Sequence, residues 1–198
     1  SDFVRDAKDF PLTQFRSRTS AASEAVGYGK SLMVYHMLRR EVGDKVFLAA
    51  LGRFWREHAF QRASFDDLAA AFSAETGTDW TPFFASWVER GGAPRLAIAQ
   101  VDARPAPDGE GYQVELTLEQ VQREEPFPVT VPVVVTVSAG SSAQAVVRMT
   151  GRTARLTVAT PARPLRLDVD PAFDVMRRLD PAEIPPALST VLGEDAPI

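Results

Sequence analysis

The chain has 198 residues, of which 45% are hydrophobic and 24% are charged, and its formal net charge at pH 7 is −4. This composition is typical of a globular protein, and an acidic balance without a basic run argues against a nucleic-acid partner. The absence of cysteine excludes disulfides and thiol nucleophiles, and no apolar run reaches the ~20 residues of a membrane span.

The first half of the chain has the period of α-helices, from residue 24 to residue 90. Apolar residues on nearly every side predict a buried helix over residues 26–41, which Gly43 ends. Asp44 then caps a second helix, whose apolar residues repeat at the spacing of one helix face.

Two further helices follow in this half. Ser64, with Asp67 three residues later, predicts a capping box and a third helix. The neighbouring pair Asp66 and Asp67 is therefore a capping feature and not a catalytic dyad. A fourth helix over residues 80–90 carries an aromatic face that we expect to pack in the core, against the following domain: Trp80, Phe83, Phe84 and Trp87.

After Gly91 and Gly92 the hydrophobic period changes to two, which is the signature of β-strands. Six short alternating runs separated by turn residues predict an antiparallel immunoglobulin-like β-sandwich. We expect a short helix from Asp170 to Arg178 and an extended tail after it. The fold class is thus α+β, with a helical domain over 1–92, a β-sandwich domain over 93–180, and a tail or linker over 181–198.

One tyrosine stands out as a candidate catalytic group. Tyr28 lies between Gly27 and Gly29, where the first apolar helix is expected to begin, and Lys30 follows. A phenol held rigidly at such a point can donate a hydrogen bond to charge that develops during a reaction. The alternative is that Tyr28 simply packs on the core. Lys30 either neutralises a carboxylate or holds the turn, and we favour the structural role.

The two histidines do not suggest a metal site. His36 is expected in the middle of the first helix and His58 near the end of the second, and we interpret both as core histidines. The His-Glu-x-x-His pattern that places a metal and a general base on one helix is absent from the sequence. The sequence therefore predicts no metal ligands and no cofactor in this chain.

The order of several short motifs resembles the C-terminal part of the catalytic domain of aminopeptidase N-like zinc metallopeptidases, the gluzincins, with the β-sandwich that follows it. Residues 28–31 lie where that family has Tyr-x-Lys-Gly, although Ser31 replaces its glycine. The stretches 34–39, 64–68, 77–80 and 83–87 follow in the family order, and residues 92–96 match the Gly-x-Pro-x-Leu exit into the sandwich.

The resemblance implies that Tyr28 donates a hydrogen bond to the oxyanion of the tetrahedral intermediate, supported by Gly27, Gly29 and Lys30. It also implies zinc and a peptide substrate in the parent enzyme. The partner of this chain would be the upstream, zinc-binding part of the same catalytic domain. We therefore expect a fragment that is inactive alone. The alternative is a non-catalytic module, helical and immunoglobulin-like, that binds a partner or has a structural role.

Overall fold

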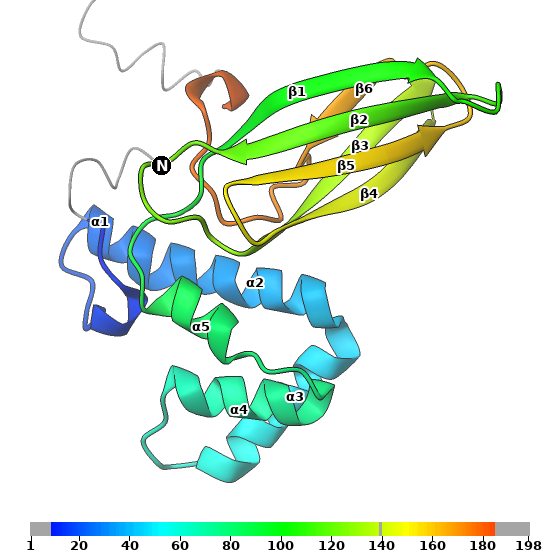
Figure 1. Cartoon of the computed structure of the whole chain (residues 1–198). Coiled ribbons are helices and arrows are strands. Elements are labelled where there is room, and N and C mark those ends of the chain that lie inside the picture. The colour runs from blue at the N-terminus through cyan, green and yellow to red at the C-terminus, as the bar shows by residue number, and fades with distance from the viewer. Residues whose placement is uncertain (1–8, 139, 185–198) are drawn as a thin grey trace, which may run out of the picture.

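The computed structural model describes residues 9–138 and 140–184, and its first half is helical (Figure 1). Its last two α-helices are connected through a left-handed glycine, Gly77, and the Ser64–Asp67 capping box of the third predicted helix is confirmed. The bounds of this half are η1 Leu12–Gln14, α1 Ala21–Glu24, η2 Ala25–Lys30, α2 Ser31–Val42, α3 Asp44–His58, α4 Phe65–Thr76 and α5 Thr81–Val88.

The second half is a sandwich of two antiparallel sheets with strand orders β1-β2-β5 and β4-β3-β6. Alternate residues of β3 are buried, as the period of two predicted. The predicted α+β class is confirmed. The strands are β1 Leu96–Pro105, β2 Tyr112–Gln120, β3 Val129–Ser138, β4 Ser141–Met149, β5 Thr153–Thr160 and β6 Arg166–Val169, and η3 Pro181–Glu183 follows them.

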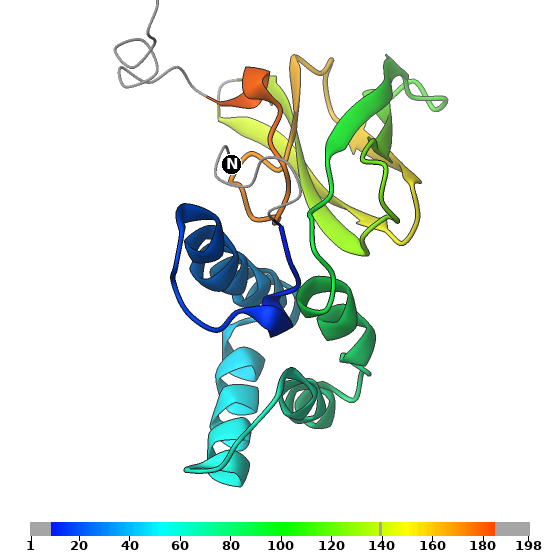
Figure 2. The same cartoon turned by 90° about the vertical axis from the view of Figure 1, so that its left-hand side faces the viewer.

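Helices α2 and α5 lie next to the sandwich, whereas α3 and α4 lie farther from it (Figures 1 and 2). The contact between the halves centres on Trp87, which is fully buried and whose ring centroid lies 5.0 Å from that of Phe127. Gln120 fixes the loop that carries Phe127, because its amide donates to the Phe127 carbonyl at 2.7 Å and accepts from the Phe127 N–H at 2.9 Å. The predicted packing of the aromatic face against the sandwich is therefore present at Trp87.

Two predictions about the first helix are wrong. The helix does not begin at residue 26: Ser20 caps it with Ser23, and the backbone runs on through η2 into α2. It is also not buried on all sides, since Val34 and Leu38 are buried but Leu32 is 69% exposed. Methionine, tyrosine and leucine side chains made the sequence look uniformly apolar, although only one side of the helix meets the core.

The predicted helix from Asp170 to Arg178 does not form. Asp170 and Phe173 both have positive φ angles, 51° and 56°, which an α-helix does not allow. The Asp170 side chain accepts a hydrogen bond from the Asp174 N–H at 2.7 Å and so shapes an irregular segment. Of the predicted extended tail, Pro181–Glu183 forms the short η3 helix, and residues 185–198 lie outside the described part. No helix in residues 9–138 and 140–184 is both long and apolar enough to span a bilayer.

Candidate functional site

Tyr28 lies in the π-helical segment η2, within the continuous helix that runs from α1 into α2. Such segments insert a wider turn into a helix and are frequent at functional sites. The Ser31 hydroxyl donates to the Gly27 carbonyl at 2.6 Å and gives that carbonyl a side-chain partner. The local backbone around Tyr28 is thus a fixed turn inside a helix, rather than the helix start that the glycines suggested.

The Tyr28 side chain is 60% exposed, so it is not packed in the core. Its ring contacts Phe15 edge-on, with centroids 5.8 Å apart at an interplanar angle of 72°. The Phe15 ring also covers Gly27, where an added Cβ would lie only 2.3 Å from a ring carbon. Gly27 is therefore needed for the close approach of Phe15, which in turn limits the positions that the tyrosine ring can take.

Gly29 differs from Gly27, because an added Cβ there would meet no atom within 4 Å. It lines a cavity of about 630 Å³ between η2 and the segment after β6, together with Lys30, Met33, Arg178 and others. Packing in this chain therefore does not explain Gly29, in contrast to Gly27.

Lys30 is almost fully buried, with 1% of its surface exposed. Its Nζ donates to the Arg90 carbonyl at 2.6 Å and, at 3.4 Å, to the Gly92 carbonyl. Burial lowers the pKa of Lys30, nearby Asp9 opposes that shift, and the Arg90 charge adds to it. Lys30 thus links the tyrosine-bearing segment by hydrogen bonds to the connection between the two halves.

Arg90, whose carbonyl accepts from Lys30, also contacts the sandwich through its side chain. Its guanidinium donates to the carbonyls of Glu125 and Pro126 at 2.6 and 3.2 Å, and lies 4.1 Å from the centroid of the Phe127 ring. On the other side, the Asp9 carboxylate accepts from the Gly92 N–H at 2.6 Å. Lys30 therefore bonds to a connection that is itself fixed by Asp9 on one side and by residues 125–127 on the other.

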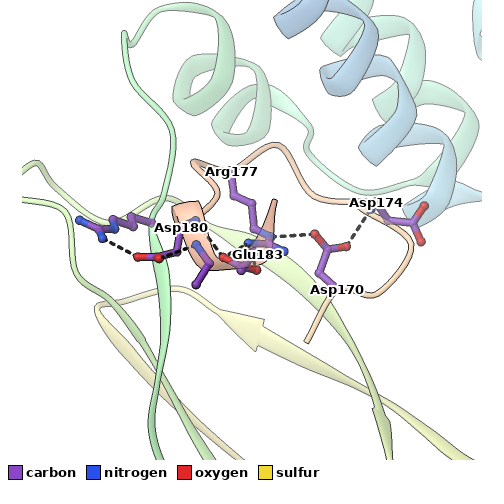
Figure 3. A network of polar contacts seen from close by, with 7 residues as sticks. Asp170, Asp174, Arg177, Asp180 and Glu183 are labelled. Atoms are coloured by element: carbon purple, nitrogen blue, oxygen red, sulfur yellow. Dashed lines mark hydrogen bonds and ion pairs between the residues drawn. The ribbon is translucent and has the colours of Figure 1, made fainter. Parts of the chain in front are cut away.

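The segment after β6 is fixed by a polar network (Figure 3). Arg177, whose side chain is 3% exposed, donates through Nε to Asp170 at 2.8 Å and through a terminal nitrogen to Glu183 at 2.8 Å. Burial raises the pKa of Asp170, and the Arg177 guanidinium opposes that shift. The Asp174 carboxylate then reaches α2, where it lies 2.7 Å from His36 Nε2. This network holds one wall of the cavity beside Lys30.

Neither histidine is a core residue of the predicted kind. The His36 side chain is 37% exposed and pairs with Asp174. His58 stacks on Phe54 and lies 4.0 Å from an Asp67 carboxylate oxygen. Within the described part of the chain, no three His, Cys, Asp or Glu side chains come together as a metal site.

The sequence singled out Tyr28, Gly27, Gly29 and Lys30 as candidates, but it did not point to the residues around them. Residues 27–30 are separated in the sequence from Asp9 and Phe15, which precede them, and from Arg90, which follows them. No spacing rule links these residues to the motif. The only local signal was the Gly91–Gly92 pair, which marked the connection that Lys30 contacts. The structure brings Gly27 and Lys30 into defined contacts, and it leaves Gly29 at the cavity.

Comparisons with known proteins give partial matches. No model of a known protein family matches the chain. Aminopeptidase N of Lactococcus lactis subsp. lactis is 33% identical over 78 residues, which are 39% of this chain and 9% of that protein. Aminopeptidase M1 of Arabidopsis thaliana is 32% identical over 81 residues, 41% of this chain and 9% of that protein. Tricorn protease-interacting factor F2 of Thermoplasma volcanium is 25% identical over 115 residues, 54% and 14% of the two chains.

The fold also has a solved counterpart. The structure of Legionella pneumophila aminopeptidase A in complex with aspartic acid superposes with a TM-score of 0.65 at 20% identity, covering 88% of this chain and 21% of that chain. The matched segments thus span about a tenth of the curated relatives and a fifth of the structural neighbour. The resemblance expected from the motifs is confirmed: this chain is similar to one part of aminopeptidases of this kind.

Proposed function

We propose that this chain supplies the oxyanion-stabilising tyrosine, and the β-sandwich that supports it, to an aminopeptidase N-like metallopeptidase. The observation that carries the proposal is the placement of Tyr28: it is exposed on a π-helical turn, its ring contacts Phe15 edge-on, and the buried Lys30 two residues later bonds to the Arg90 carbonyl. The sequence matches to aminopeptidases and the shared fold support it.

The chemistry assigned to this chain is a single hydrogen bond. When water adds to the scissile carbonyl, the carbonyl oxygen gains negative charge, and the Tyr28 hydroxyl donates its proton in a hydrogen bond to that oxygen. A donor that is already oriented costs no reorganisation at the moment of reaction. The Phe15 edge contact and the Lys30 tie provide that orientation, because they restrict the ring and the backbone that carries it.

The described residues do not fit a zinc site, since they bring no cluster of metal-ligating side chains together. We therefore assign no step to a metal held by this chain. In the proposal, zinc, its ligands and the general base belong to polypeptide outside these 198 residues, and the peptide substrate binds where the two parts meet.

The test is Tyr28→Phe in the complete polypeptide that contains this chain, assayed with an aminoacyl p-nitroanilide. Loss of one oxyanion donor lowers kcat by about 10²–10³-fold, and zinc content should stay unchanged. Tyr35→Phe is the matched control, because Tyr35 lies two turns along on α2 and contacts Phe47 instead. An unchanged kcat in Tyr28→Phe would remove this residue from the mechanism.

The 198-residue chain by itself provides a second measurement. We expect it to show no zinc-dependent hydrolysis of the same substrate. Hydrolysis that persists through purification and disappears on adding a chelator would contradict the proposal, because the chain would then hold a complete site.

A further inference from the structure

Another cavity lies where α2 and α5 meet the sandwich (Figure 1). We call it the interface cavity. Its walls come from α2, from α5 and the residue before it, from β3 and β4 with the residues beside them, and from the segment after β6. Its volume is about 420 Å³, which is in the range of small-molecule sites. It shares no residue with the cavity beside Lys30.

The buried part of this lining is apolar and partly aromatic. Trp87, Val129 and Met149 line the cavity and are at most 7% exposed. Met37 and Phe83 are half-buried members of the same lining. An aromatic ring suits such a surface, because rings pack edge-on or offset against other rings and methionine side chains adapt to the shape of their neighbours. The cavity therefore favours a ligand with a flat apolar body.

Trp87 also brings an unpaired donor to this lining. Within residues 9–138 and 140–184, its indole Nε1 is the one buried side-chain nitrogen or oxygen without a hydrogen-bond partner. Buried polar groups in folded proteins are almost always paired, and the other lining tryptophan follows that rule, since Trp80 Nε1 donates to the Thr76 hydroxyl at 2.8 Å. A ligand atom that accepts a hydrogen bond from Trp87 supplies the missing partner.

Two ion pairs at the cavity set the charge of the ligand. Arg148 of β4 pairs with Glu41 of α2, and Arg40 lies 3.4 Å from Asp174. The carboxylates are the more buried partners, with side chains 27% and 16% exposed, whereas those of Arg148 and Arg40 are 69% and 62% exposed. Asp174 is engaged by His36 as well. Because a guanidinium has five N–H donors, both arginines keep donors for an anion.

The acidic groups next to the lining on α2 and α5 are already bound to other donors. Asp44 accepts two hydrogen bonds from Arg39, at 2.7 and 2.8 Å. Asp79, which precedes the lining residue Trp80, accepts from the Thr81 N–H at 2.9 Å. The exposed charge that borders the cavity is thus that of the two arginines, which favours a carboxylate on the ligand.

We propose that the interface cavity binds a small aromatic carboxylate, with the carboxylate on Arg148 and Arg40 and with an acceptor atom on the ring for the Trp87 indole N–H. The apolar lining, the unpaired donor and the exposed arginines each require one part of this ligand. The proposal uses neither Tyr28 nor a metal. It therefore stands or fails independently of the proposed function.

Three probes, titrated into the 198-residue chain, separate the parts of the ligand. Phloretate has a ring, a carboxylate and a phenol oxygen that can accept a hydrogen bond. Hydrocinnamate lacks the phenol, and phloretamide lacks the charge. We expect saturable binding of phloretate by calorimetry, and about tenfold weaker binding of each of the other two, because each loses a hydrogen bond with a buried or charged protein donor.

The indole N–H resonances report on Trp87 directly, since the chain has three tryptophans. Trp55→Phe and Trp80→Phe assign two of the three resonances, which leaves that of Trp87 without substituting this buried residue. Phloretate should move the Trp87 resonance downfield, because a new hydrogen bond deshields the proton, and hydrocinnamate should not. The resonance of Trp55, which does not line the cavity, should stay in place.

Two pairs of variants locate the site. Arg148→Gln should weaken phloretate binding about tenfold, whereas Arg155→Gln, at an exposed arginine of β5 outside the lining, should leave it unchanged. Val146→Phe should also weaken binding, because it places a ring in the lining. Val101→Phe is its matched control, since Val101 and Val146 are both 48% exposed and only Val146 lines the cavity.

Four results would overturn the proposal. The first is no saturable binding of phloretate. The second is binding that leaves the Trp87 resonance where it was. The third is binding that neither Arg148→Gln nor Val146→Phe weakens, because the ligand would then lie elsewhere. The fourth is loss of binding in the complete polypeptide that contains this chain, because another part of that polypeptide would then fill the cavity.

Discussion

The buried ammonium of Lys30 gives the sharpest prediction about stability. Lys30→Met keeps an unbranched apolar side chain that is one atom shorter, and it removes the donor to the Arg90 and Gly92 carbonyls, at 2.6 and 3.4 Å. A hydrogen bond from a charged group contributes about 1.5–3 kcal/mol. The desolvation that lowers the pKa of Lys30 offsets part of that gain, so we expect a loss of about 2 kcal/mol at pH 7.

The expected loss of stability is large enough to measure by urea or thermal denaturation followed by circular dichroism. For a chain of this size, about 2 kcal/mol corresponds to a fall of roughly 4–8 °C in Tm. Lys45→Met is the control, because Lys45 is exposed on α3 and such substitutions usually change stability by less than about 0.5 kcal/mol. If Lys30→Met lowers the free energy of unfolding no more than Lys45→Met does, the hydrogen bonds from Lys30 to the Arg90 and Gly92 carbonyls do not stabilise the fold.

The difference in stability between the parent chain and Lys30→Met should change with pH in a definite direction. Because the folded-state pKa of Lys30 is lowered from 10.5, the unfolded chain keeps the Lys30 proton over a pH range in which the folded chain has lost it. Unfolding then takes up a proton, so the stability contributed by Lys30 rises with pH between the lowered value and 10.5. The stability difference between the parent chain and Lys30→Met should therefore widen from pH 7 to pH 10.5, and a constant or shrinking difference would contradict the assigned burial.

Two paired substitutions test the other contacts of the site by thermal and urea denaturation. Gly27→Ala should destabilise the chain by about 1–3 kcal/mol, because its methyl group overlaps the Phe15 ring and overpacking costs that much. Gly29→Ala, at an open position of the same turn, should stabilise the chain by up to about 1 kcal/mol through helix propensity. Equal effects at the two positions would contradict the close approach of Phe15 to Gly27. Arg177→Met should lower the free energy of unfolding by about 3–5 kcal/mol because it leaves buried Asp170 unpaired, whereas Arg178→Met, at a half-exposed neighbour, should change it little. A small loss in Arg177→Met would show that the network in Figure 3 does not stabilise the segment after β6.

Much of the fold follows from local patterns in the sequence. The Ser64–Asp67 capping box, the turn at Gly77 and the alternation along β3 are all present in the structure, because capping and strand periodicity act between residues only a few positions apart. The same locality explains the errors. The segment after Asp170 contains residues that suit a helix, but the Asp170 carboxylate accepts hydrogen bonds from the Asp174 N–H and from Arg177 Nε, which favours an irregular path.

For the candidate site, too, the local sequence indicated some features and the tertiary structure decided the others. The sequence by itself determined that a tyrosine between two glycines, followed by a lysine, belongs to a helical half that leads into a β-sandwich. Only the tertiary structure decided that Tyr28 is exposed on a π-helical turn, that Phe15 covers Gly27, and that Lys30 is buried against Arg90 and Gly92. The physical reason is that exposure and hydrogen-bond partners depend on segments far away along the chain, such as the Arg90 and Gly92 carbonyls, which lie 60 and 62 residues from Lys30. The packing of Trp87 against Phe127 joins the two halves near this connection.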